Sequence, residues 1–219
     1  MPNHDPTNAL SFPELFRDDA LRLETRRLWL RWPSALDAPA LHEIASLEAV
    51  ARSTATWPHP FPDGEAVKRI QQAHAVNSAG SGLRLALTAK SWPGRLIGLV
   101  GVDCDGDGLT LGYLLGVEHQ GKGLMTEAVR AIVNAVFRYT PFTVIRGAAG
   151  QTNHASRRVM EKAGFRVTRQ FSHPAPARGA AVTCDEFELV RADWKMRPCL
   201  TVWPLAERHA VEIPSDCAA

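Results

Sequence analysis

The sequence predicts an α/β protein, because two segments in its second half each pass from an apolar strand into a helix. The first segment has an apolar run at residues 109–115, a short loop containing residues 121–123 (GKG), and then a helix with its apolar residues near one face. The second has a buried strand at residues 142–147 (FTVIRG), followed by a helix that ends at Gly164, a favoured residue after a last helical turn.

The glycine loop of the first segment predicts a ligand with a phosphate or pyrophosphate group. A strand, a glycine loop and a helix point several backbone N–H groups and the positive end of the helix at an anion. Neither of two better-known phosphate loops fits. The nucleoside-triphosphate loop needs Ser or Thr at Gly123 to hold magnesium, and the dinucleotide loop needs Gly or Ala at Thr126. Alone, the pattern also fits a plain strand-to-helix turn with incidental glycines.

Two motifs together narrow the choice of protein family. They are G-Y-x-L…G-K-G-x-x-T-E-A over residues 112–128 and N-x-x-S-x-R-V-x-E-K-A-G-F over residues 153–165. In combination they resemble the GNAT acetyltransferase superfamily, in the branch that includes the Rim-type ribosomal-protein N-acetyltransferases. The likeness covers about residues 22–196. Its further elements are an opening strand at 24–31, a linker at 50–62, a helix at 66–75, a strand pair at 84–88 and 96–102, and a closing strand at 186–194.

The resemblance implies one GNAT-like domain over residues 22–196. It would contain a mixed, mostly antiparallel sheet of six or seven strands with helices on both faces. A central parallel pair, residues 109–115 and 143–146, would splay apart where the coenzyme enters. Residues 1–21 and 197–219 fall outside the likeness, and we expect an N-terminal arm and a C-terminal extension that are packed on the surface or partly disordered.

The resemblance also implies an enzyme, an acyltransferase. It would move an acetyl group from acetyl-coenzyme A to a primary amine by direct attack in a ternary complex, with no metal. The residues expected to bind the coenzyme lie at the strand end, in the glycine loop and at the start of the later helix: Leu114, Leu115, His119, Gln120, Gly121, Lys122, Gly123, Leu124 and Asn153.

Ser156 is the expected catalytic residue. In the Rim-type branch, a serine at this position lies near the thioester sulfur, where its hydroxyl can donate a proton to the departing thiolate. The sequence also allows plainer roles, a helix-surface serine for Ser156 and a helix N-cap for Asn153. Glu127 in T-E-A is expected to have a structural role on its helix.

The chain departs from family patterns at two catalytic positions. Met160 stands where some members carry a tyrosine acid, and Ala148 stands where some carry a glutamate base. The remaining candidates for a base are Asp103, Glu118 and His74, or a chain of water molecules. The missing base keeps open a second class of function, a catalytically silent acyl-coenzyme A-binding domain that senses or scaffolds.

The acceptor is expected at residues 53–62 and at residues 169–181, the latter predicted to be a loop from their Pro and Gly content. Trp57 and Phe61 suggest an apolar wall, and neither segment has an acidic cluster that would suit a polycation. We therefore expect a peptide N-terminus or a small amine with an apolar body.

Bulk properties exclude several other classes. The formal charge of +2 over 219 residues predicts no nucleic-acid partner, and no apolar run reaches the about twenty residues needed to cross a membrane. The N-terminus lacks the pattern of a secretory signal, and the four cysteines are scattered without C-x-x-C spacing. These features predict a cytoplasmic protein with reduced thiols and no metal site. They leave open whether it forms a homodimer.

Overall fold

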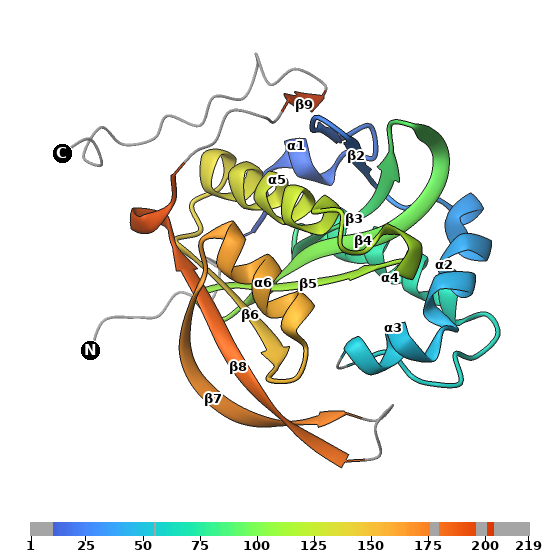
Figure 1. The fold of residues 1–219 in the computed structure, drawn as a ribbon. Helices are drawn as coiled ribbons and strands as arrows, with labels where there is room; N and C mark the ends of the chain where they lie inside the picture. Colours follow the sequence, from blue (N-terminus) through green and yellow to red (C-terminus); the bar gives the residue numbers. More distant parts are fainter. Residues whose placement is uncertain (1–10, 55, 176–179, 196–200, 204–219) are drawn as a thin grey trace, which may run out of the picture.

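The computed structural model describes residues 11–54, 56–175, 180–195 and 201–203. Nine strands of this part of the chain form one sheet in the order β7-β8-β6-β5-β4-β3-β2-β1-β9 (Figure 1). Their bounds are β1 Arg22–Glu24, β2 Leu28–Arg31, β3 Gly82–Ala89, β4 Trp92–Asp105, β5 Gly108–Leu115, β6 Val144–Gly150, β7 Arg166–Ala175, β8 Ala180–Val190 and β9 Thr201–Trp203. Only β5 and β6 pair in parallel within this sheet, and the other neighbours are antiparallel.

Helices pack on both faces of the sheet, as predicted. They are α1 Glu14–Arg17, α2 Ala38–Ala45, α3 Glu48–Ser53, α4 Glu65–Ala79, α5 Leu124–Tyr139 and α6 His154–Ala163, with 3-10 turns η1 Ala35–Asp37, η2 Val117–His119 and η4 Arg191–Asp193. The larger core cluster joins α1, α5 and α6 to one face, and the smaller joins α2, α3 and α4 to the other. The two clusters make the sheet the middle layer of the domain.

The parallel pair β5–β6 splays apart, which confirms the prediction for the centre of the sheet. The strands pair only where residues 109–111 meet residues 145–147. Beyond that point β5 stays with β4 as far as Leu115, while β6 stays with β8 as far as Gly150. A gap therefore opens between the last residues of β5 and of β6.

Several predicted segments have a different secondary structure. Residues 50–53 of the predicted linker belong to α3, and residues 191–193 of the predicted closing strand form η4. Residues 24–31 are not one strand, because the chain turns at Thr25, whose N–H donates to the Leu28 carbonyl, and β1 and β2 pair as a hairpin. Residues 169–175, expected in a loop, belong to β7, which pairs with β8 from Arg166 to Ala175. Because β7 is an edge strand, it tolerates a proline such as Pro174. The split strand and β9 raise the strand number above the six or seven predicted.

The predicted N-terminal arm contributes to the main core. Phe12 and Phe16 are 1% and 0% exposed, and the Phe12 ring lies 5.4 Å from that of Phe142. At the other end of the chain, β9 pairs with β1 and buries Val202. The rest of the predicted arm and extension, at residues 1–10, 196–200 and 204–219, lies outside the described part.

Candidate active site

The glycine loop follows β5 and leads directly into α5. Gly121 and Gly123 have φ of 72° and 73°, a left-handed conformation that glycine adopts without strain. The N–H groups of His119 and Gln120 bond within the turn, to Gly116 O and Val117 O. Among the described residues, the N–H groups of residues 121–126 have no partner. These groups lie just before and within the first turn of α5, a helix of sixteen residues that begins at Leu124. The loop can therefore bind an anion.

The turn between β1 and β2 is hydrogen-bonded both to the first turn of α5 and to the glycine loop. Glu127 in the first turn of α5 accepts hydrogen bonds from Thr25 Oγ1 at 2.7 Å, from Arg27 N at 2.8 Å and from Arg27 Nε at 2.7 Å. Arg27 Nη1 in turn donates to the Lys122 carbonyl at 2.9 Å. Burial would raise the pKa of Glu127, but the hydrogen bonds from Thr25 and Arg27 outweigh it and hold the pKa below its ordinary value. Nothing in the sequence pointed to Arg27 here, because spacing does not reveal a contact across 100 residues.

The backbone of β5 divides its hydrogen-bonding groups between β4 and the gap. Gly116 N–H donates to Ile97 O at 2.9 Å, so Gly116 faces β4. Successive residues of a strand direct these groups to opposite sides, so Leu114 also faces β4 while Tyr113 and Leu115 face the gap. The Leu115 carbonyl already accepts from Gln120 Nε2 at 3.0 Å. Of the two leucines expected to bind the coenzyme arm, Leu115 is the one with an N–H directed at the gap.

Asn153 and Ser156 lie at the start of α6, across the gap from β5. Asn153 Oδ1 accepts from Ser156 N at 3.0 Å, which is the N-cap role that the sequence allowed, and its Nδ2 donates to Ser53 O at 2.9 Å. Ser156 Oγ lies 2.8 Å from the Tyr113 hydroxyl, and either group can donate. The Tyr113 hydroxyl also lies 3.2 Å from the Ser156 carbonyl. The cap and the tyrosine together hold Ser156 in place.

Tyr113 was not expected in the site, although it lies in the G-Y-x-L motif. Its contact with Ser156 joins segments 43 residues apart, a distance at which the sequence gives no signal. Burial raises the pKa of Tyr113 to about 12, and the hydrogen bond with Ser156 only partly opposes this effect. Tyr113 is therefore a neutral hydroxyl at physiological pH.

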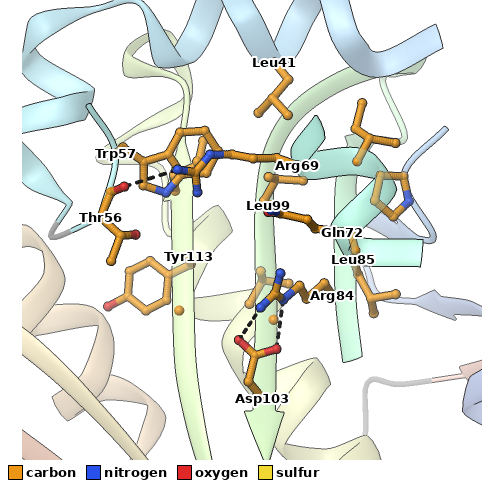
Figure 2. A pocket seen from close by; sticks show the side chains of 17 residues that line it. Leu41, Thr56, Trp57, Arg69, Gln72, Arg84, Leu85, Leu99, Asp103 and Tyr113 are labelled. Carbon is orange, nitrogen blue, oxygen red and sulfur yellow. Dashed lines mark hydrogen bonds and ion pairs between the residues drawn. The ribbon is translucent and has the colours of Figure 1, made fainter. Parts of the chain in front are cut away.

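A pocket of about 200 Å³ adjoins the Tyr113 ring (Figure 2). It lies between α4, the segment before α4 and strands β3–β5. Its lining includes apolar side chains and three charged ones: Leu41, Trp57, Ile70, Leu85, Leu99 and Leu114, with Arg69, Arg84 and Asp103. Trp57 stacks on Phe61, and the Arg69 guanidinium lies 4.2 Å from a Trp57 ring centroid. Residues 169–173 and 181 of the β7–β8 hairpin, where we also expected the acceptor, do not line this pocket, and residues 176–179 of that predicted segment lie outside the described part.

The three candidate bases differ in position. Asp103 lines the pocket, but both of its carboxylate oxygens accept hydrogen bonds from Arg84, at 2.8 and 3.0 Å. Glu118 pairs with His119 at 3.3 Å in the loop, and His74 Nε2 lies 2.6 Å from Pro33 O. Neither Glu118 nor His74 lines the pocket.

Two further properties of the described residues bear on other classes of protein. No three His, Cys, Asp or Glu side chains there come together as ligands of a metal ion would. No helix in that part of the chain has both the length and the apolar content needed to span a membrane.

The fold, with its splayed strands, glycine loop and adjoining pocket, is that of an acyltransferase. The family described as acetyltransferase (GNAT) domain matches residues 27–166, and the chain belongs to this family. It is thus an enzyme of the acyltransferase class, as the two sequence motifs predict.

Individual relatives agree with this assignment. The chain is 46% identical over 55 residues to the probable N-acetyltransferase YjcK of Bacillus subtilis (strain 168), a match that spans 25% of this chain and 30% of that protein. The fold is similar to that of Mycobacterium smegmatis RimJ in complex with CoA-disulfide, with a TM-score of 0.69, 17% identity, and coverage of 80% of this chain and 88% of that one. It is also similar to RimL, the ribosomal L7/L12 α-N-protein acetyltransferase in complex with coenzyme A, with a TM-score of 0.68, 17% identity, and coverage of 76% and 95%. The structural neighbours therefore include Rim-type enzymes, as the sequence motifs predict.

Proposed function

We propose that this chain is an N-acetyltransferase that moves an acetyl group from acetyl-coenzyme A to a primary amine by direct attack in a ternary complex. The observation that carries the proposal is the position of Tyr113. Its ring lines the pocket, and its hydroxyl meets Ser156 beside the gap between β5 and β6. An amine in the pocket and a thioester in the gap would therefore meet at the same residue of β5.

The coenzyme binds along the gap. Its pyrophosphate accepts hydrogen bonds from the free N–H groups that begin at Gly121, and its pantetheine arm lies beside Leu115 and Tyr113 like an added strand. Support comes from RimL and RimJ, whose structures contain coenzyme A or its disulfide. Asn153 positions Ser156 through its cap, and any contact of Asn153 with the arm is additional to that role.

Acetyl transfer uses groups on both sides of the gap. The amine nitrogen attacks the thioester carbon, and the N–H of Leu115 stabilises the negative charge that develops on the carbonyl oxygen. As the carbon–sulfur bond breaks, Ser156 Oγ–H donates a proton to the sulfur. No acetyl-enzyme forms, because the amine attacks the thioester itself.

The pocket favours a peptide N-terminus or a small amine with an apolar body. At about 200 Å³ it is smaller than the roughly 300–1,000 Å³ typical of sites that enclose a drug-sized ligand, so it would take the end of a longer molecule or one small amine. Its charged lining residues are two arginines and one aspartate, a balance that disfavours a polycation. Trp57, Leu99 and Leu114 supply the apolar part of the pocket lining.

A turnover assay with acetyl-coenzyme A tests the proposal through release of free thiol. The acceptors are peptides with a free N-terminus, the same peptides with a blocked N-terminus as matched controls, small aromatic amines, spermidine and an aminoglycoside. We expect the highest kcat/KM with free peptides or aromatic amines and no release with blocked peptides. A strong preference for spermidine or the aminoglycoside would contradict the acceptor assignment. Coenzyme binding in calorimetry without thiol release from any amine would instead identify a silent binding domain.

A further inference from the structure

Acetyl transfer leaves one proton to be moved. A neutral amine that attacks a thioester becomes positively charged at nitrogen, while the departing sulfur needs a proton. Among the described residues, Asp103 is the one carboxylate that lines the pocket, and Arg84 occupies both of its oxygens. The position where some family members carry a tyrosine acid holds Met160, which is 1% exposed and packs in the core. The proton therefore needs another route.

Tyr113 and Ser156 offer a path between the two reacting groups. Their hydroxyl oxygens are 2.8 Å apart, an ordinary distance for an O–H···O hydrogen bond. Figure 2 shows the Tyr113 ring at the edge of the pocket, with its hydroxyl turned away from the Arg84–Asp103 pair. The tyrosine thus borders the acceptor, and the serine lies beside the gap that leads to the glycine loop.

We propose, on the basis of the proposed function, that the Tyr113 and Ser156 hydroxyls form a relay of two groups that carries the proton from the attacking amine to the departing thiolate. Tyr113 Oη takes the proton from the positively charged nitrogen of the tetrahedral intermediate and gives its own proton to Ser156 Oγ. Ser156 gives its proton to the sulfur as the carbon–sulfur bond breaks and its electron pair moves to sulfur. Both hydroxyls end neutral, and the products are the N-acetylated amine and coenzyme A with a free thiol.

The surroundings of both groups suit a relay. Burial keeps Tyr113 protonated, so it gives up its proton only when another arrives. The backbone of Ser156 is held by its N–H bond to Asn153 Oδ1, and its Oγ lies 2.8 Å from the Tyr113 hydroxyl. Since the relay returns to its starting state without an ionised base, it also accounts for turnover in a chain that lacks the family glutamate at Ala148.

The test compares the wild-type enzyme with Tyr113→Phe, Ser156→Ala and the double variant, using an amine that the wild type accepts. Tyr113→Phe should lower kcat by about a hundredfold, the size of a lost proton-transfer step, while the Kd of coenzyme A changes less than about twofold. The double variant should be no slower than the slower single variant, because both changes break one path. Tyr139→Phe changes the other tyrosine of the chain, which ends α5 far from the glycine loop, and should leave kcat unchanged.

Isotope and pH measurements separate a relay from a structural role of the tyrosine. When kcat of the wild type is plotted against the fraction of heavy water, the plot should be curved, because several protons move in the same step. The plot for Tyr113→Phe should be linear. The midpoint of the rise of kcat/KM with pH should follow the pKa of the amine when the acceptor is exchanged. A midpoint that stays constant across acceptors, or losses that add in the double variant, would overturn the relay.

The outcome also distinguishes the relay from the proposed function. If the wild type acetylates an amine and Tyr113→Phe, folded by circular dichroism, keeps full kcat, the relay is wrong and the function stands. If the wild type releases no thiol with any amine, both are wrong.

Discussion

Gly121 has a conformation and a location that can be tested separately. Its φ is 72°, and a Cβ added to it would meet no atom within 4 Å. Gly94, near the start of β4 where that strand lies beside α2, has φ of 92° and equally open surroundings. Valine at either position therefore carries a similar backbone strain, of the order of 1–3 kcal/mol. Only at Gly121 would the new side chain also lie where we propose that the phosphates bind.

We predict that Gly121→Val weakens coenzyme A binding at least tenfold, about 1.4 kcal/mol, while Gly94→Val leaves it unchanged. Isothermal titration calorimetry measures the affinities, and thermal melts check that the two variants lose similar stability. If the two variants bind coenzyme A with equal affinity, the glycine loop is not part of the binding site.

Ser156 is the second residue whose role can be measured. Ser156→Ala removes the proposed proton donor and should lower kcat by roughly tenfold to a few hundredfold, with little change in coenzyme affinity. Ser78→Ala, an exposed serine in the last turn of α4, is a matched control that should keep wild-type kinetics. Full activity of Ser156→Ala, or an acetylated enzyme trapped in mass spectrometry, would contradict direct attack assisted by this serine.

At the level of elements, the β1–β2 turn and the first turn of α5 act as one unit through Glu127. Glu127 accepts three hydrogen bonds from Thr25 and Arg27, and Arg27 reaches on to the Lys122 carbonyl of the glycine loop. Tying down a loop carbonyl fixes the orientation of the peptide units around it. The turn therefore helps to keep the loop N–H groups directed outward.

Glu127→Gln should loosen this unit. Because hydrogen bonds to a charged group contribute about 1.5–3 kcal/mol each, we expect a clear fall in thermal stability and a several-fold weaker affinity for coenzyme A. Glu161→Gln, on the exposed side of α6, serves as control and should change neither quantity. An unchanged coenzyme affinity in Glu127→Gln would show that the loop is rigid without the turn.

The pH dependence of this contribution has a definite sign. The pKa of Glu127 is lower in the folded protein than its ordinary value of 4.5, so its contribution to stability is complete above that value and disappears as pH falls through the lowered pKa. The difference in melting temperature between wild type and Glu127→Gln should be constant from about pH 6 to 8 and shrink at more acid pH. A difference that grows at acid pH would contradict the lowered pKa.

At the scale of the whole molecule, Phe12 and Phe16 join the described start of the chain to the main core. Phe16 is fully buried in the cluster that also contains the α5 side chains beside the sheet. We predict that Phe16→Ala lowers the free energy of unfolding by about 3–5 kcal/mol, as for other large-to-small changes in a core. Leu36→Ala, at a side chain that is 90% exposed, should change it by less than about 0.5 kcal/mol. Urea unfolding of both variants checks the prediction, and equal midpoints would mean that the segment is dispensable.

Much of the fold could be predicted because its elements depend on the properties of neighbouring residues. Alternation and apolar runs indicated β5 and β6, apolar periodicity indicated α5, and the left-handed conformation needed after a helix explains Gly164, which caps α6 with φ of 105°. The β7 strand was missed because Pro and Gly content is a weak guide at a sheet edge, where proline is tolerated.

The chain by itself determined its family, the glycine loop and the placement of Ser156 on a helix, since motif spacing and glycine conformation are properties of neighbouring residues. Only the tertiary structure decided which distant groups meet. The order of strands brings Tyr113 to Ser156 and Arg27 to Glu127, and it leaves Leu114 facing β4 while Leu115 faces the gap. Such contacts depend on how the sheet assembles from strands far apart in sequence, so no local pattern records them.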